Sequence, residues 1–262
     1  MSSTFTLTQA QRAQFRETGV VRMPGVIPTG AAAAMADRLW EACERLHGVL
    51  RGQPETWTSE RLFQFNELRR DGAFSPMRSA GLEALLDDFF GGRGWTAPQH
   101  WGGPLVTFPG GGEWTVTAGA WHLDILPGQP LDPWPSVVRV FTFLEPGPPG
   151  GGGTLFVAGS ARLAMALVAA RHAKLRSAKL REAMKRASPW IAELCSTVDA
   201  GDRTRRFMQE GTELDGVRLV VGEMTGEPGD VWLMHPGTLH AGAMNCGAGP
   251  RMMLAETINA AR

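Results

Sequence analysis

The amino-acid sequence predicts a mainly antiparallel β fold, a sandwich or jelly roll, with flanking helices. After Trp95, short β-prone runs alternate with Gly/Pro turns at the spacing typical of such folds. The chain contains 33 glycines and 18 prolines among 262 residues, which suits many tight turns better than a helical bundle. Strands and helices do not alternate regularly, so the pattern disfavours a doubly wound parallel sheet.

The N-terminal part of the chain predicts helices that pack on one sheet. Residues 8–17 are expected to form a short helix that ends at Gly19, where a left-handed backbone suits glycine. A strand is expected over 20–23, before a Pro-Gly pair. Apolar residues at three- and four-residue spacing predict a helix over 31–50, and another is expected over 82–90.

Eight later segments are expected to form the strands of the antiparallel fold. They are residues 105–108, 114–117, 137–144, 154–157, 217–223, 231–234, 238–244 and 251–259. These short β-prone runs alternate with Gly/Pro turns.

One segment interrupts these strands, and we expect it to be a lid-like helical insert over about residues 161–215. Its helical part, expected over 161–194, carries a run of basic residues: Arg171, Lys174, Arg176, Lys179, Arg181, Lys185 and Arg186. Two interpretations stay open, a solvated helix face and a lid or patch that meets an anionic substrate. Because no repeat or linker is visible, we expect one domain over 1–262.

Composition excludes several classes of protein. Lys plus Arg and Asp plus Glu each number 26, and this zero formal charge argues against a nucleic-acid binder. No apolar run reaches the ~20 residues needed to span a bilayer, so we expect no membrane partner. Three widely spaced cysteines disfavour a disulfide framework and suit the reducing cytoplasm.

A histidine and a carboxylate two residues apart, His122 and Asp124, are the first chemical signal. In extended backbone, these two side chains lie on one face while Leu123 points to the other. The imidazole and the carboxylate can therefore supply two ligands to one octahedral metal ion. The tripeptide is common by chance, so it needs a further ligand from elsewhere.

The C-terminal block from Gly229 to Arg251 offers that ligand. A second histidine would complete the two-histidine, one-carboxylate triad that is typical of non-haem Fe(II) oxygenases. From the residues alone, His235 and His240 are equivalent candidates. Arg251 lies on the expected strand that follows, and its planar guanidinium suits a carboxylate such as that of 2-oxoglutarate.

Four stretches of the sequence form a recognisable set. They are LTQAQRAQFRETGVVRMPGVIP, WHLD, GGGTLFVAGSAR, and GDVWLMHPGTLHAGAMN followed by an arginine. The set resembles the phytanoyl-CoA dioxygenase-like family of Fe(II)/2-oxoglutarate oxygenases, whereas residues 43–98 and 163–215 match nothing in it. Where the family has Gly-Ser-His, this chain has Gly159-Ser160-Ala161, which puts neighbouring contacts in doubt but not the metal ligands.

The resemblance implies a double-stranded β-helix, the cupin-like jelly roll, with a site for Fe(II), 2-oxoglutarate and O2. Its ligands would be His122, Asp124 and His240, and Arg251 would anchor 2-oxoglutarate. Phe141 matches an aromatic residue beside the cosubstrate. Separately, Gln129 lies seven residues after His122 and is expected to hydrogen-bond 2-oxoglutarate.

Arg139 also leaves two interpretations. It shares a face of strand 137–144 with Val137, Phe141 and Phe143. An arginine among aromatic residues is either at a solvated edge or in a cavity, where it would pair with an anionic substrate.

The resemblance further implies hydroxylation, or a related oxidation, of a small organic molecule with conversion of 2-oxoglutarate to succinate. Halogenating relatives have a small residue in place of the aspartate, whereas Asp124 is present here. Two other classes are considered, a metal-dependent cupin-like isomerase or hydrolase and a catalytically silent binding protein. Arg251 and its block argue against the first, and the full ligand set argues against the second.

Overall fold

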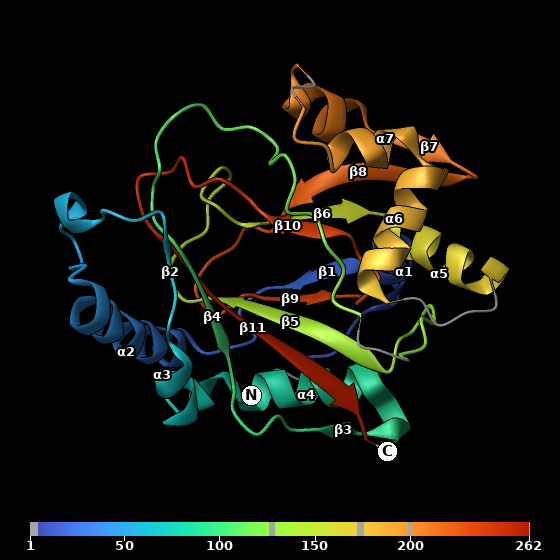
Figure 1. Ribbon diagram of the computed structural model, residues 1–262. Helices are drawn as coiled ribbons and strands as arrows, with labels where there is room; N and C mark the ends of the chain where they lie inside the picture. The colour runs from blue at the N-terminus through green and yellow to red at the C-terminus, as the bar shows by residue number, and fades with distance from the viewer. Residues whose placement is uncertain (1–4, 126–128, 172–175, 199–200, 262) are drawn as a thin grey trace.

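Two antiparallel sheets face each other in the computed structural model, which describes residues 5–125, 129–171, 176–198 and 201–261 (Figure 1). The larger sheet has the strand order β1 (Val20–Met23), β9 (Val231–Met234), β5 (Val137–Phe143), β11 (Arg251–Ala260), β4 (Gly103–Thr107) and β2 (Arg61–Leu62). β3 (Trp95–Thr96) pairs with the end of β11. The smaller sheet has the order β10 (His240–Gly242), β6 (Thr154–Ala158), β8 (Val217–Glu223) and β7 (Thr212–Leu214). This architecture confirms the predicted jelly roll.

Successive side chains of a strand point to opposite faces of the sheet, and this alternation divides the core into layers. In β5, Val138 and Val140 contact the cluster under the N-terminal helices, whereas Phe141 and Phe143 face the space between the sheets. From the smaller sheet, Phe156 of β6 enters the same space and lies 5.7 Å from the ring of Trp232. Aromatic side chains therefore fill much of the inner layer.

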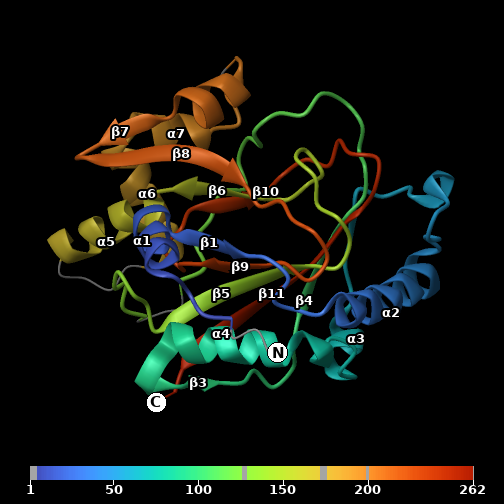
Figure 2. The same cartoon turned by 180° about the vertical axis from the view of Figure 1, so that it is seen from behind.

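Helices of the N-terminal part cover the outer face of the larger sheet, as predicted (Figure 2). They are α2 (Thr29–His47), α3 (Asn66–Arg70) and α4 (Ala80–Phe90), while α1 (Gln9–Thr18) lies beside the edge strand β1 and buries Phe15 in the same core. α1 begins at a capping box, in which the side chains of Thr8 and Gln11 each accept a hydrogen bond from the backbone N–H of the other residue. It ends at Gly19, which has φ of 83°. α2 begins and ends earlier than predicted, and it ends at His47 because Gly48 takes the left-handed conformation.

The insert packs on the outer face of the smaller sheet (Figure 1). The helix expected over 161–194 is divided into α5 (Ser160–Arg171), α6 (Ser177–Ala187) and α7 (Pro189–Leu194), with a π-helical turn, Arg205–Glu210, further on. Ser188 caps α7 and Pro189 opens it, which explains the second break. Residues 172–175, which include Lys174, lie outside the described part of the chain.

Two expected strands differ in the structure. Residues 114–117 form no strand, because Arg203 donates to the carbonyl oxygens of Val116 and Thr117 and holds them in irregular backbone. The strand expected over 238–244 is reduced to His240–Gly242. Across the described ranges, no helix is long and apolar enough to cross a membrane.

Candidate metal centre

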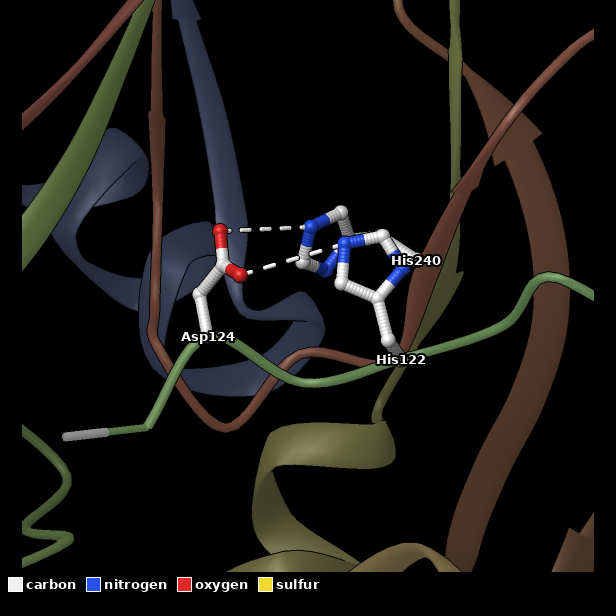
Figure 3. Close-up of side chains that lie close together, drawn as sticks. All are labelled: His122, Asp124 and His240. Atoms are coloured by element: carbon white, nitrogen blue, oxygen red, sulfur yellow. Dashed lines mark ion pairs between the residues drawn. The ribbon is translucent and has the colours of Figure 1, made fainter. Parts of the chain in front are cut away.

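Backbone pairing brings two distant histidines together. His122 and His240 form an isolated antiparallel bridge, with N–O distances of 2.9 Å and 3.0 Å in the two directions. Their imidazole rings lie side by side with centroids 4.2 Å apart, and Asp124 faces both rings (Figure 3). The local pairing of the loop at 122 with β10 therefore creates the cluster.

Side chains alternate in direction along residues 121–124, as predicted, and this positions His122 and Asp124. Trp121 and Leu123 are buried against the smaller sheet, so His122 and Asp124 point the other way into a cavity. Immediately before them, Ala120 has φ of 51°, a left-handed conformation that is rare for a residue with a Cβ atom. This local strain turns the chain into the bridge.

The two imidazoles present the same nitrogen to the cluster. Nδ1 of His122 donates to the Ala120 carbonyl and Nδ1 of His240 donates to the Thr238 carbonyl, each at 3.0 Å. Because these acceptors take the Nδ1 protons, each Nε2 keeps a free lone pair for a metal ion.

The donor atoms are close enough to share one ion. His122 Nε2 lies 3.8 Å from Asp124 Oδ1, His240 Nε2 lies 3.5 Å from Oδ2, and one donor atom from each residue falls within 4.8 Å of the others. Neighbouring ligands of an octahedral ion with ~2.1 Å bonds are about 3 Å apart. The cluster therefore has a suitable set of ligands, with donor atoms slightly farther apart than around a bound ion.

The protonation states also suit a metal ion. Burial would raise the pKa of Asp124, but contact with His240 and the charge of Arg139 outweigh it and lower this pKa to about 2. Burial and the neighbouring His240 lower the pKa of His122 below its ordinary value. A carboxylate and a neutral imidazole are the forms that bind metal.

The triad lies in a cavity of about 280 Å³ between the sheets. Arg139, Phe141 and Arg251 also line it, so the structure brings these sequence-predicted residues to one place. Gln129 is half-buried and does not line this cavity, so its contact with 2-oxoglutarate stays a prediction. Arg139 is a cavity residue and not a solvated edge.

Arg251 lies deeper in the cavity and is almost completely buried. Its Nη2 donates to Thr107 Oγ1 at 3.0 Å, while its Nε has no hydrogen-bond partner among the described residues. Burial and the nearby charge of Arg61 lower the pKa of Arg251 to about 10, and Glu223 opposes this shift. A buried guanidinium that remains charged at neutral pH, with an unused N–H, suits an anionic ligand.

Sequence reasoning did not identify Arg61 as a site residue. β2 pairs Arg61 with Thr107, and β11 pairs Arg251 with the same Thr107, so the three side chains share a sheet face. Arg61 lies in a region without periodicity, so its position follows only from the pairing of a two-residue strand.

The insert holds the loop of His122 and Asp124 from outside. Arg181 donates to the Trp121 carbonyl at 3.0 Å, and Ser177 Oγ donates to the Ile125 carbonyl at the same distance. Arg203 binds the carbonyl oxygens that precede the loop. In sequence these arginines resembled other basic residues, so no local signal distinguished them. Whether the insert acts as a lid stays a prediction.

His235, the alternative ligand, belongs to the core. It is 1% exposed, its Nε2 donates to the Asp132 carbonyl, and its Nδ1 accepts the backbone N–H of Gly237, both at 2.9 Å. Both ring nitrogens are therefore already used. His47 binds the carbonyl of Phe63, and His172 lies outside the described residues.

The buried His235 predicts a dependence of stability on pH. Burial lowers its pKa in the folded protein, although Asp132 opposes this, so the unfolded chain binds more protons below about pH 6.5. We expect the free energy of unfolding to decrease as the pH falls from about 7 to 5, by at most ~1.4 kcal/mol per pH unit from this residue. Urea unfolding followed by tryptophan fluorescence measures it.

A glutamine at position 235 cannot take up a proton in this range. His235→Gln should reduce the slope of stability against pH, although it lowers stability at neutral pH. His47→Gln serves as the matched control and should keep the wild-type slope. Equal slopes in wild type and His235→Gln would show that His235 does not cause the effect.

Comparisons with known proteins identify the fold. No protein-family model and no curated protein sequence matches the chain. Among solved structures, HygX from Streptomyces hygroscopicus with nickel and 2-oxoglutarate bound has a TM-score of 0.54 and 18% identity, covering 97% of this chain and 88% of HygX. The non-heme alpha ketoglutarate dependent epimerase SnoN from nogalamycin biosynthesis has a TM-score of 0.51 and 15% identity, covering 95% and 81%.

A third structure, AviO1 from Streptomyces viridochromogenes, has a TM-score of 0.52 and 15% identity, and the match covers 97% of this chain and 96% of AviO1. At such low identities the similarity establishes a shared fold. The chain therefore has the double-stranded β-helix fold of these proteins, among which are Fe/2-oxoglutarate-dependent enzymes.

Proposed function

We propose that the protein is a non-haem Fe(II)- and 2-oxoglutarate-dependent dioxygenase that hydroxylates a small organic molecule. The observation that carries this proposal is the convergence of His122, Asp124 and His240 in one cavity with the buried Arg251. Two imidazoles and a carboxylate form a facial ligand set that leaves positions open for a chelating cosubstrate.

The residues of the cavity fit both groups. Nε2 of each histidine and one oxygen of Asp124 would hold Fe(II). Arg251, with its unused Nε–H and with Thr107 beside it, would bind the far carboxylate of 2-oxoglutarate, and Phe141 would pack against its carbon chain. HygX binds nickel with 2-oxoglutarate and has also been crystallised with iron, which supports the assignment.

When bound, iron and 2-oxoglutarate supply the oxidising chemistry, with release of succinate and CO2. The protein orients the groups. The carbonyls of Ala120 and Thr238 fix the imidazole tautomers, and the apolar and aromatic walls limit access of water. The similar enzymes SnoN and SnoK are named as an epimerase and a carbocyclase. Hydroxylation, like membership of the phytanoyl-CoA dioxygenase-like family, therefore rests on the sequence motifs.

The test is formation of succinate by the purified protein with Fe(II), 2-oxoglutarate and O2, measured by mass spectrometry. We expect slow succinate formation without substrate, and its complete loss after chelation of the metal. A candidate substrate that accelerates it should gain one oxygen atom. Failure of the metal-loaded protein both to bind 2-oxoglutarate and to form succinate would exclude this function.

A further inference from the structure

Arg139 lies where two cavities meet. The first contains the metal triad, and the second has a volume of about 340 Å³ and opens more widely to solvent. Pro104 and Leu105 line both cavities together with Arg139. The first cavity is near the lower limit of the ~300–1,000 Å³ that is typical for one small-molecule site. Room for a cosubstrate and a substrate together therefore requires the second cavity.

The guanidinium of Arg139 is fixed on one side and available on the other. Its Nε lies 2.9 Å from Asp124 Oδ2, and its Nη1 donates to Thr257 Oγ1. Its Cζ lies 5.6 Å from the centre of the Phe141 ring. Within the described part of the chain, Nη2 makes no hydrogen bond, so one end of the planar group can still donate to a ligand.

The two cavities together carry an excess of positive charge. Four arginines line them: Arg61, Arg69, Arg139 and Arg251. The acidic residues that line them are Asp124 and Glu256, and Glu256 already pairs with Arg69 at 2.9 Å. The charges of a divalent metal ion and of the 2-oxoglutarate dianion cancel each other. Glu223 behind Arg251 offsets one charge at most, so the described residues of the two cavities keep a net positive charge that favours an anionic substrate.

The walls of the second cavity indicate the rest of the ligand. Gly103, Pro104, Leu105 and Ala255 offer apolar surface next to the polar Thr257. This combination suits a molecule with an apolar body and one charged end. A carboxylate at the charged end would accept charge-assisted hydrogen bonds from Nη2 of Arg139.

On the basis of the proposed function, we propose that the primary substrate is a small carboxylic acid whose carboxylate binds Arg139 and whose apolar body occupies the second cavity. Arg139 then determines specificity for the acid. Since an ion pair with Asp124 and a hydrogen bond to Thr257 fix the guanidinium, Arg139 orients the bound acid relative to the metal triad. The residue is a binding group for substrate and not a ligand of the metal.

Equilibrium binding tests this with matched pairs of acids and amides. The protein is loaded with Ni(II) and saturating 2-oxoglutarate, and it is titrated with benzoate and benzamide, and with cyclohexanecarboxylate and its amide. We expect the wild-type protein to bind each acid about 10–100-fold more tightly than its amide, because charge-assisted hydrogen bonds are lost in the amide. Arg139→Gln should remove this preference, and Arg139→Lys should keep part of it.

Two controls separate the possible failures. The Ni(II) and 2-oxoglutarate affinities of both variants should stay close to those of wild type, and Arg205→Gln, far more exposed, should keep the preference. Equal binding of acids and amides to wild type, including no binding of either, overturns the proposal. A preference for acids that survives in Arg139→Gln also overturns the proposal. Loss of Ni(II) binding in both variants overturns it as well, because Arg139 would then act only through Asp124. Wild type that binds neither Ni(II) nor 2-oxoglutarate instead contradicts the proposed function.

Discussion

His240→Ala is expected to remove metal binding and succinate formation while the fold persists. His240 is one of the three proposed ligands, and outside the triad its side chain is held by a hydrogen bond to the Thr238 carbonyl. Loss of an outer partner of a metal ligand already lowers affinity about 10–100-fold, so loss of the ligand itself should lower it by more. Isothermal titration with Ni(II) or anaerobic Fe(II) measures the change, and far-UV circular dichroism checks the fold.

His100→Ala is the matched control, since His100 is half-buried and outside the triad. It should bind metal as wild type does. Wild-type affinity in His240→Ala would refute the ligand assignment. Loss of metal in His100→Ala would show that the measurement reports general instability. Because His235 is fixed in the core, we do not expect it to replace His240.

Arg251→Gln is expected to weaken binding of 2-oxoglutarate strongly with little effect on the metal. The variant keeps a donor toward Thr107 but removes the buried charge. Removing one partner of a buried charged pair costs about 2–5 kcal/mol, which corresponds to roughly 30-fold to several thousand-fold in affinity. Arg251→Lys should fall between wild type and Arg251→Gln, since an ammonium cannot bind a carboxylate through two parallel hydrogen bonds.

The measurement is the dissociation constant of 2-oxoglutarate for Ni(II)-loaded protein, alongside that of Ni(II) itself. Arg45→Gln, an exposed arginine that pairs with Glu67 at 3.9 Å, is the control and should leave both constants unchanged. If Arg251→Gln weakens metal and 2-oxoglutarate binding to the same extent, the assignment of Arg251 as the cosubstrate anchor is wrong.

Much of the site could be predicted because its signals are local. His122 and Asp124 share a face because side chains two residues apart in extended backbone point the same way, and Leu123 is buried on the opposite face. Prediction failed where tertiary contacts replaced local preference. Residues 114–117 have strand-like side chains, yet Arg203 takes the carbonyl oxygens that a neighbouring strand would have bound.

The sequence by itself determined most of the elements, the alternation of faces and the types of ligand, because these depend on near neighbours in the chain. The residues alone left His235 and His240 equivalent, and the resemblance favoured His240. The tertiary structure gives the physical reason, since core hydrogen bonds use both ring nitrogens of His235 and pairing with His122 directs His240 into the cavity. For Arg61 and Arg139, only the tertiary structure decided the position. The cavity that each arginine faces depends on pairing between strands that are far apart in the sequence, and no local pattern encodes that pairing.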